Sequence, residues 1–129
     1  MKLYHGSPKK LDVLVPSKAK GISKFENQKA IFLVKTFRHA ALYAIGKTLK
    51  GKTSFAISKN KLLIAGEKKP KKGFVYKVDV KAKKGQRGQY SYYKPIKKFV
   101  IYEVFPRDYE KSIAYVKNKK EMMRLCNLS

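Results

Sequence analysis

The first residues that could do chemistry form a short polar run near the amino terminus, His5-Gly6-Ser7, directly after the apolar residues Leu3 and Tyr4. His5 is one of only two histidines in the 129 residues. Its imidazole can donate a hydrogen bond to a hydroxyl, and the neighbouring glycine lacks a Cβ, so that a flat ligand can lie against the backbone. This combination suits a nucleoside.

Two aromatic residues downstream could complete such a site. Phe32 lies in the apolar run 30–34, and Tyr43 follows it by eleven positions in the segment 37–46, which has a helical pattern. Two rings that converge from a strand and the next helix can hold a planar ring between them. Each residue by itself is better explained as a surface histidine or a core aromatic, so the prediction depends on their combination.

These motifs together resemble a known fold. The run YHGS, the strand around Phe32 and the A-x-x-Y-A pattern of residues 40–44 are similar to the ADP-ribosyltransferase fold of the diphtheria-toxin and poly(ADP-ribose) polymerase type, in particular its small prokaryotic and viral members. The resemblance covers residues 3–44 and continues through the later strands. It implies one α+β domain over residues 1–129, with a split β-sheet core, a helix after the second strand and a C-terminal helix.

The resemblance also implies NAD as the substrate. His5 would hydrogen-bond a ribose hydroxyl, Gly6 would pair its backbone with the nicotinamide carboxamide, and Ser7 would support that amide. Phe32 and Tyr43 would hold the nicotinamide ring between them. His5 and Tyr43 are thereby implied as catalytic residues.

The third motif of that family is a glutamate at the start of a late strand, where it stabilises the positive charge that develops as nicotinamide leaves. Aligning the segment 89–99 with this strand places Gln89 at the position, and aligning 97–103 places Lys98 there. Neither residue is an acid, and Glu103 is a nearby carboxylate in the sequence. Gln89 is therefore predicted as the third site residue, without the usual charge.

Two functions follow from the resemblance. The first is an NAD-dependent transferase that moves ADP-ribose to nucleic acid or to a nucleic-acid-associated protein. The alternative is a catalytically inactive module of the same fold, which binds nucleic acid or an acidic protein through its lysines. Removal of a 2′-phosphate from RNA by the same fold would favour several Arg and His at the site, and the chain has four Arg.

Two other motifs are less informative. The segment 46–53, GKTLKGKT, matches the phosphate-binding pattern G-x-x-x-x-G-K-[ST]. That loop must leave a strand and open a helix, whereas here a helical segment precedes it and the strand-like run 54–58 follows. His5, His39 and Cys126 are too far apart in sequence to suggest a metal site.

The elements that must position these residues are mostly strands. Short β-branched and aromatic runs predict strands at seven places: 2–6, 30–34, 54–58, 61–66, 73–80, 89–93 and 97–105. Thr36 is a candidate N-cap for a helix that ends near Gly46, and a second helix is expected over 109–126. The basic segments 67–73 and 81–88 are expected to be loops.

The net charge of the chain indicates which partners it attracts. The chain has 32 Lys and Arg against 8 Asp and Glu, a formal net charge of +24. Such a domain attracts polyanions, so nucleic acid or an acidic partner is expected to associate with it. The 43% of hydrophobic residues is enough for a folded core, no apolar run is long enough to span a membrane, and one cysteine fits a reducing, cytoplasmic setting. The sequence predicts no oligomeric state.

Overall fold

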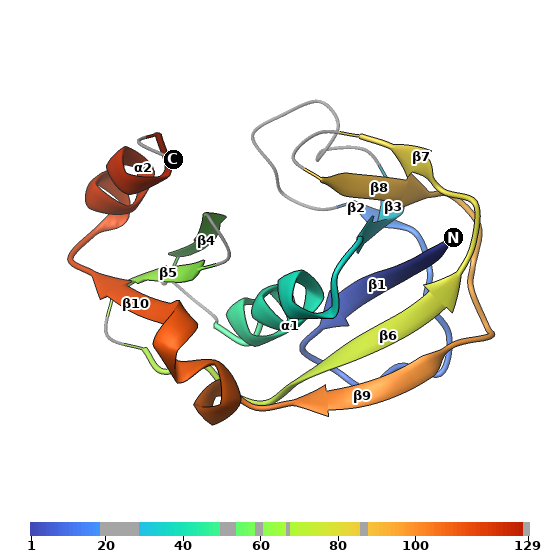
Figure 1. Ribbon diagram of the computed structural model, residues 1–129, viewed down its shortest axis with the longest axis horizontal. Helices are drawn as coiled ribbons and strands as arrows, with labels where there is room; N and C mark the ends of the chain where they lie inside the picture. Colours follow the sequence, from blue (N-terminus) through green and yellow to red (C-terminus); the bar gives the residue numbers. More distant parts are fainter. Residues whose placement is uncertain (19–28, 50–53, 59–60, 67, 86–87, 128–129) are drawn as a thin grey trace.

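The computed structural model describes residues 1–18, 29–49, 54–58, 61–66, 68–85 and 88–127. Their strands form two sheets, and the helix α1 (Phe37–Gly46) lies between these sheets (Figure 1). The fold is therefore of the α+β class, as the sequence predicts.

The larger sheet has seven strands within the described residues. They are β1 (Lys2–Ser7), β2 (Ser17–Lys18), β3 (Lys29–Val34), β6 (Gly73–Asp79), β7 (Lys83–Lys84), β8 (Gln89–Tyr92) and β9 (Val100–Val104). The order across the sheet is β7-β8-β3-β1-β6-β9, β2 also pairs with β3, and every pairing is antiparallel. The five predicted strands of this sheet are confirmed, while the two-residue strands β2 and β7 were not expected.

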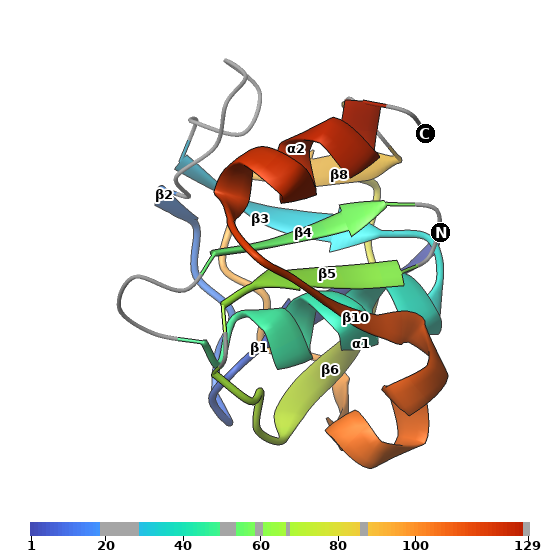
Figure 2. The same cartoon turned by 90° about the vertical axis from the view of Figure 1, so that its left-hand side faces the viewer.

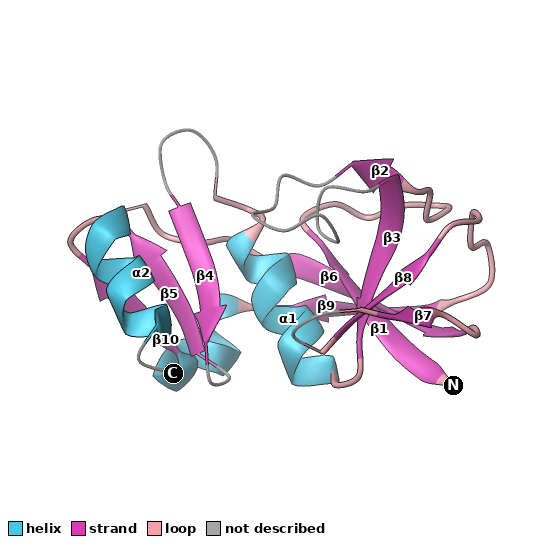
Figure 3. Cartoon of the chain, turned by 90° about the horizontal axis from the view of Figure 1, so that it is seen from above, coloured by secondary structure: helices cyan, strands magenta, loops and turns pink. Residues whose placement is uncertain are grey.

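The smaller sheet has three strands and carries the C-terminal helix. It consists of β4 (Ser54–Ser58), β5 (Lys61–Ala65) and β10 (Ile113–Val116), with β5 in the middle, antiparallel to β4 and parallel to β10. The helix α2 (Lys119–Asn127) packs on its outer face through Met122, which contacts Leu63 and Ala65. Figure 3 shows the resulting order of layers: α2, the small sheet, α1 and the large sheet. Figure 2 looks onto the small sheet, with β5 and β10 in front of α1.

The helix α1 begins where the sequence predicts. The Thr36 side chain accepts a hydrogen bond from the backbone N–H of His39 (3.2 Å) and so caps the first turn. Ala40, Ala41 and Leu42 are fully buried even though they point in different directions around the helix axis. A helix with buried apolar residues on more than one side fits this position, because α1 packs against Val34 and Val75 of one sheet and against Leu62 and Ile64 of the other.

The opposite face of the large sheet is covered by irregular chain. Leu3, Leu33 and Val78 form a second buried cluster on that face. The segments on either side of Leu14 and Ile96 cross over this cluster and are joined by two backbone hydrogen bonds between those residues (2.9 and 2.8 Å). Each strand of the sheet thus uses its alternating side chains for two separate cores.

The expected helix over 109–126 is wrong in its first half. That stretch contains the end of a 3₁₀ helix η1 (Pro106–Ser112) and the strand β10, and the α-helix starts only at Lys119. The segment Ile113–Val116 is rich in strand-forming residues and gains backbone partners along β5, which outweighs its helical periodicity. The start of α2 has side-chain caps: Asn118 Oδ1 accepts from the Glu121 N–H (2.9 Å), and Glu121 Oε2 accepts from the Lys117 N–H (3.2 Å).

The two basic segments differ from each other. Residues 68–72 form no strand or helix, as expected, whereas β7 in the second segment pairs with Tyr90 and Ser91 of β8. Gly88 has a φ of 73° beside this strand pair, a conformation that glycine adopts without penalty. No helix in the described part of the chain has the length and apolar character needed to cross a membrane.

Candidate functional site

The pairing between β1 and β3 opens at the residues that the sequence singles out. Tyr4 pairs with Val34, and continuing this register would bring Gly6 opposite Phe32. Instead, the Phe32 carbonyl oxygen lies 2.8 Å from Nδ1 of His5, and the Gly6 carbonyl oxygen accepts from Nζ of Lys47 (2.8 Å). We call this opened stretch, formed by His5, Gly6, Phe32 and Lys47, the β1–β3 seam.

The backbone of Gly6 faces this seam. The Met1 carbonyl accepts from the Val80 N–H, and β1 pairs with β6 in an unbroken antiparallel register from Lys2 to Ser7. Alternate residues of an antiparallel strand bond to opposite neighbours, so the odd-numbered residues of β1 bond to β6 and the even-numbered ones face β3. The Gly6 N–H and C=O therefore both point into the seam.

His5 is neutral in this position. Its Nδ1 must carry the proton, because the Phe32 carbonyl oxygen can only accept. Burial, and after it the positive charge of Lys47, lower the pKa of His5 to about 3. Nε2 is then an acceptor at neutral pH, so the imidazole would accept a hydrogen bond from a sugar hydroxyl there. This corrects the expectation that the His5 imidazole would donate a hydrogen bond to the hydroxyl.

Lys47 is the cation of the seam. Its ammonium contacts the Gly6 carbonyl oxygen and lies 6.0 Å from the centroid of the Tyr43 ring. Desolvation at this contact lowers the pKa of Lys47 to about 8, although part of the residue is exposed to solvent. The ammonium therefore still carries its charge at pH 7.

Gly6 is required by the packing of α1. A Cβ on Gly6 would lie 2.3 Å from the Ala40 carbonyl oxygen and 2.8 Å from the Ala44 nitrogen, both of which belong to the helix backbone. The space that the missing Cβ leaves is therefore filled by α1, contrary to the expectation that a ligand would use it. The same close approach brings Tyr43 beside the strand, since the Tyr43 Cβ would lie 3.2 Å from a Cβ added at Gly6.

Tyr43 contacts Gln89 and His39. Its hydroxyl accepts a hydrogen bond from Nε2 of Gln89 (2.7 Å), and its ring stacks on His39 with centroids 5.1 Å apart at 20°. Gln89 is the first residue of β8, is buried, and pairs across the sheet with Val34. The structure thus brings the residue predicted for the third motif into direct contact with the predicted aromatic.

The site residues border the seam from two faces of the sheet. Phe32 shares its face of β3 with Val34, which packs against α1, so Phe32 and Tyr43 lie on the same side. His5 shares the other face of β1 with Leu3 and lies 6.1 Å from the ring of Tyr76, centroid to centroid. A ligand that touches both His5 and Tyr43 would have to pass through the seam.

Three other candidate residues lie elsewhere or act locally. The buried Ser7 hydroxyl accepts from the Lys9 N–H (3.2 Å) and stabilises the turn after β1. Glu103 is on the edge strand β9, with its carboxylate 3.7 Å from Lys72 Nζ. Lys98 lines a pocket that contains none of the seam residues. Of the three candidates for the third motif, Gln89 is the one in contact with Tyr43.

The sequence interpretation missed His39 and Lys47. Both flank Tyr43 at a spacing of four residues, so the three side chains share one face of α1. That spacing was visible in the sequence. What was not visible is that the face turns toward the open end of the β1–β3 ladder.

The remaining motifs add no second site. The G-x-x-x-x-G-K-[ST] pattern starts at the C-terminal end of α1 and leads to β4, the reverse of the order that phosphate binding needs, and its residues 50–53 lie outside the described part of the chain. Among the described residues there is no group of three or more His, Cys, Asp and Glu that could hold a metal ion.

Comparison of the chain with protein-family models, with curated proteins and with solved structures finds no match in any of the three.

Proposed function

We propose that this chain binds NAD across the β1–β3 seam and is an ADP-ribosyltransferase-like protein. The observation that carries the proposal is the backbone of Gly6, whose N–H and C=O point into the seam, with Tyr43 packed beside it. The Gly6 N–H and C=O, which point into the seam beside an aromatic ring, are well suited to an amide-bearing planar ligand such as nicotinamide.

Each seam residue has a part in this proposal. The Gly6 N–H and C=O would pair with the carboxamide once the Lys47 ammonium moves from the Gly6 oxygen toward the negative pyrophosphate. The nicotinamide ring would lie between Tyr43 and Phe32, which are on the same side of the sheet. Nε2 of His5 would accept from a ribose hydroxyl on the far side of the seam.

Transfer of ADP-ribose would be slow. Gln89 keeps an oxygen acceptor next to Tyr43 but has no negative charge to stabilise the cationic sugar that forms as nicotinamide leaves. Loss of one preorganised electrostatic group in an active site lowers the rate by about 10²–10³. The proposed acceptor is nucleic acid or a protein bound to it, because the net charge of +24 favours such targets.

Binding is tested by titrating NAD into the protein in a calorimeter. Tyr43→Ala should weaken binding about tenfold, because base–aromatic stacking contributes roughly 1–3 kcal/mol. Tyr115→Ala removes an exposed tyrosine from the small sheet and should leave binding unchanged. In the wild type, NAD should shift the backbone amide signals of Gly6 and Phe32 in NMR spectra. Unshifted amides at saturating NAD would contradict the proposed site.

Turnover is tested by restoring the missing charge. Gln89→Glu should raise the transfer of label from NAD to RNA, DNA or protein by about 10²–10³ over the wild type. Gln89→Leu has a similar size and no polar group, and it should lower transfer below the wild-type level. If the glutamate variant still binds NAD but transfers no more label than the wild type, the transferase part of the proposal is wrong.

A second candidate is a catalytically silent module of the same kind. The neutral Gln89 and the adjacent Lys47 cation favour it, because both oppose the formation of a positive charge at the seam. Under this alternative the wild type binds NAD without consuming it, and only Gln89→Glu shows turnover. Measurable consumption by the wild type would exclude it.

A further inference from the structure

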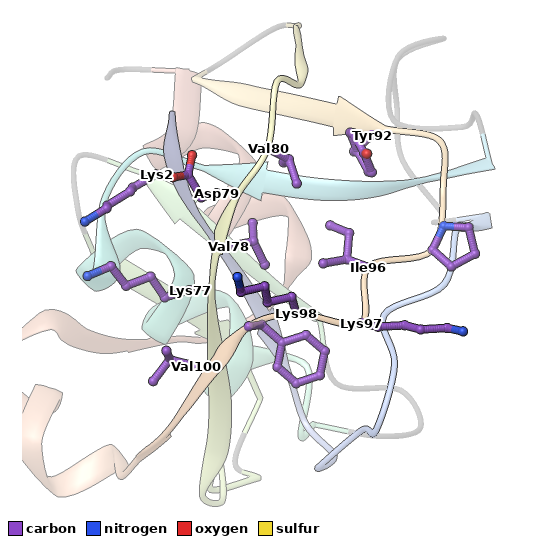
Figure 4. Close-up of a pocket in the computed structure, with 12 residues that line it drawn as sticks. Lys2, Lys77, Val78, Asp79, Val80, Tyr92, Ile96, Lys97, Lys98 and Val100 are labelled. Atoms are coloured by element: carbon purple, nitrogen blue, oxygen red, sulfur yellow. The ribbon is translucent and has the colours of Figure 1, made fainter.

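The face of the large sheet opposite α1 contains an open pocket of about 880 Å³. Its apolar lining comes from the second core cluster and its borders, with Val78, Val80, Ile96 and Phe99 among the lining residues. Figure 4 shows Val78, Val80, Ile96 and Tyr92 around the middle of this pocket. The floor is thus suited to a flat, apolar surface such as the face of a nucleobase.

The rim of the same pocket is strongly basic. Four lysines line it: Lys2, Lys77, Lys97 and Lys98. In Figure 4, Lys2 and Lys77 reach outward on one side and Lys97 on the other, while Lys98 lies across the middle of the view. The acid in the lining is Asp79, and its carboxylate is already paired with the amino terminus at 2.9 Å. The rim therefore presents net positive charge around an apolar floor.

A second, smaller pocket of about 400 Å³ continues this surface. It shares Tyr92 with the first pocket and adds Tyr93, which is 47% exposed. Its lysines are Lys81, Lys83 and Lys94. The two pockets share Tyr92 and are together lined by seven lysines and two tyrosines, and we call this surface the lysine channel.

We propose that the lysine channel binds single-stranded nucleic acid, with phosphates at the lysines and bases on Tyr92, Tyr93 and the apolar floor. Lysines that follow a groove together with aromatic side chains are the general means of binding a single strand without reading its sequence. A duplex hides its base faces inside the stack and could use only the lysines. Acidic side chains would likewise gain nothing from the apolar floor.

This inference is independent of the proposed NAD site. The channel includes none of His5, Gly6, Phe32, Tyr43 or Lys47. Failure of NAD binding would therefore leave the channel untouched, and the reverse also holds.

The experiment measures the anisotropy of a fluorescent 12-nucleotide oligo(U) on addition of the full chain at 50–200 mM salt. The same measurement is made with a blunt duplex and with a 12-residue polyglutamate peptide. Lys97→Gln/Lys98→Gln should reduce the slope of log affinity against log salt by about 1.4, because two phosphate contacts, each contributing about 0.7 on a single strand, are lost. The matched control, Lys119→Gln/Lys120→Gln, removes the same charge from exposed positions on α2 and should leave the slope near the wild-type value.

The aromatic contribution has its own pair of variants. Tyr93→Ala should weaken binding of oligo(U) roughly fivefold or more, since one stacking platform is lost. Tyr115 is 51% exposed and lies on the small sheet, so Tyr115→Ala should leave the binding of oligo(U) unchanged. Both lysine pairs are exposed, and thermal unfolding followed by circular dichroism identifies any variant that fails to fold. If a variant fails to fold, its affinity measurement is replaced by photocrosslinking of 4-thiouridine RNA to the wild type. This crosslinking should label residues 92–99.

Three results would overturn the proposal. Equal losses for the two lysine pairs would mean that diffuse charge alone binds the oligonucleotide. Equal affinity for the duplex would exclude single-strand recognition. Polyglutamate binding that is as tight as that of oligo(U), with the same loss on Lys97→Gln/Lys98→Gln, would assign the channel to an acidic protein instead.

Discussion

The side-chain amide of Gln89 donates to the hydroxyl of Tyr43 at 2.7 Å, and this contact joins the strand β8 to the helix α1. Both groups are at least partly buried. If either side chain were removed, the other would lose a hydrogen-bond partner that water could not readily replace. The pair consequently stabilises the position of Tyr43 over Gly6 as well as the fold.

A double-mutant cycle measures this coupling. Gln89→Leu leaves the Tyr43 hydroxyl without its donor and should lower the free energy of unfolding by about 1–3 kcal/mol. Adding Tyr43→Phe to that variant should cost less than it does in the wild type, with a coupling of about 0.5–3 kcal/mol. Urea denaturation of the four proteins gives the values. Strict additivity would show that the contact contributes nothing.

Gly6→Ala should destabilise the protein through its contact with α1. The new Cβ meets helix backbone atoms at 2.3 and 2.8 Å, so the helix has to move, and overpacking of this kind costs about 1–3 kcal/mol or more. Gly88→Asn is the control, because Asn tolerates a φ of 73° and nothing lies within 4 Å of the added Cβ. Similar unfolding midpoints in urea for the two variants would contradict this role of Gly6.

The low pKa of His5 predicts a loss of stability in acid. The folded state keeps His5 neutral down to about pH 3, whereas the unfolded chain protonates it near pH 6.5. Between these values the unfolded state binds more protons, so the free energy of unfolding falls as the pH falls, by at most about 1.4 kcal/mol per pH unit. Above pH 6.5 this group adds no pH dependence.

The measurement compares wild type with His5→Gln, in which the amide can still donate to the Phe32 carbonyl. Carboxylate titrations are common to both proteins, so the difference between their stabilities isolates His5. Wild type should lose stability relative to the variant between pH 6.5 and pH 4.5. Parallel curves across this range would mean that His5 titrates alike in both states.

Lys47→Met should raise the pKa of His5. The lysine charge is one of the causes that lower this pKa, after burial, and methionine removes the charge while keeping much of the side-chain volume. NMR titration of the His5 imidazole signals measures the shift. His39, whose pKa is lowered by burial, provides an internal reference in the same spectra. An unchanged His5 midpoint would indicate that the ammonium is screened from the imidazole.

Much of the fold could be predicted from local patterns. The strand around Phe32 and the helix begun by Thr36 are set by apolar periodicity and a capping side chain, which are both properties of adjacent residues. The strand β10 could not be predicted in this way, because it is stabilised by β5, whose partner residue Leu62 precedes Ile113 by 51 positions. Its sequence by itself fits a helix equally well.

The site residues also differ in whether local sequence could predict them. His5, Gly6, Phe32 and Tyr43 could be proposed from the sequence, since each falls in a recognisable strand or helix. The protonation of His5 could not, because it depends on where the Phe32 carbonyl points once the ladder opens. Lys47 was missed for a similar reason: a lysine at the end of a helix is ordinarily solvated, and only the fold brings it to the Gly6 oxygen.

The parallel pairing of β5 with β10 also bears on how the chain emerges from the ribosome. Leu62 and Ile64 are synthesised well before Ile113 and Tyr115, which complete their strand on one side. Until then a nascent chain presents an apolar strand with one open edge, the kind of template that recruits other polypeptides. Truncation before residue 113 should therefore yield aggregates, and a chaperone that shields β5 during translation should raise the yield of folded protein.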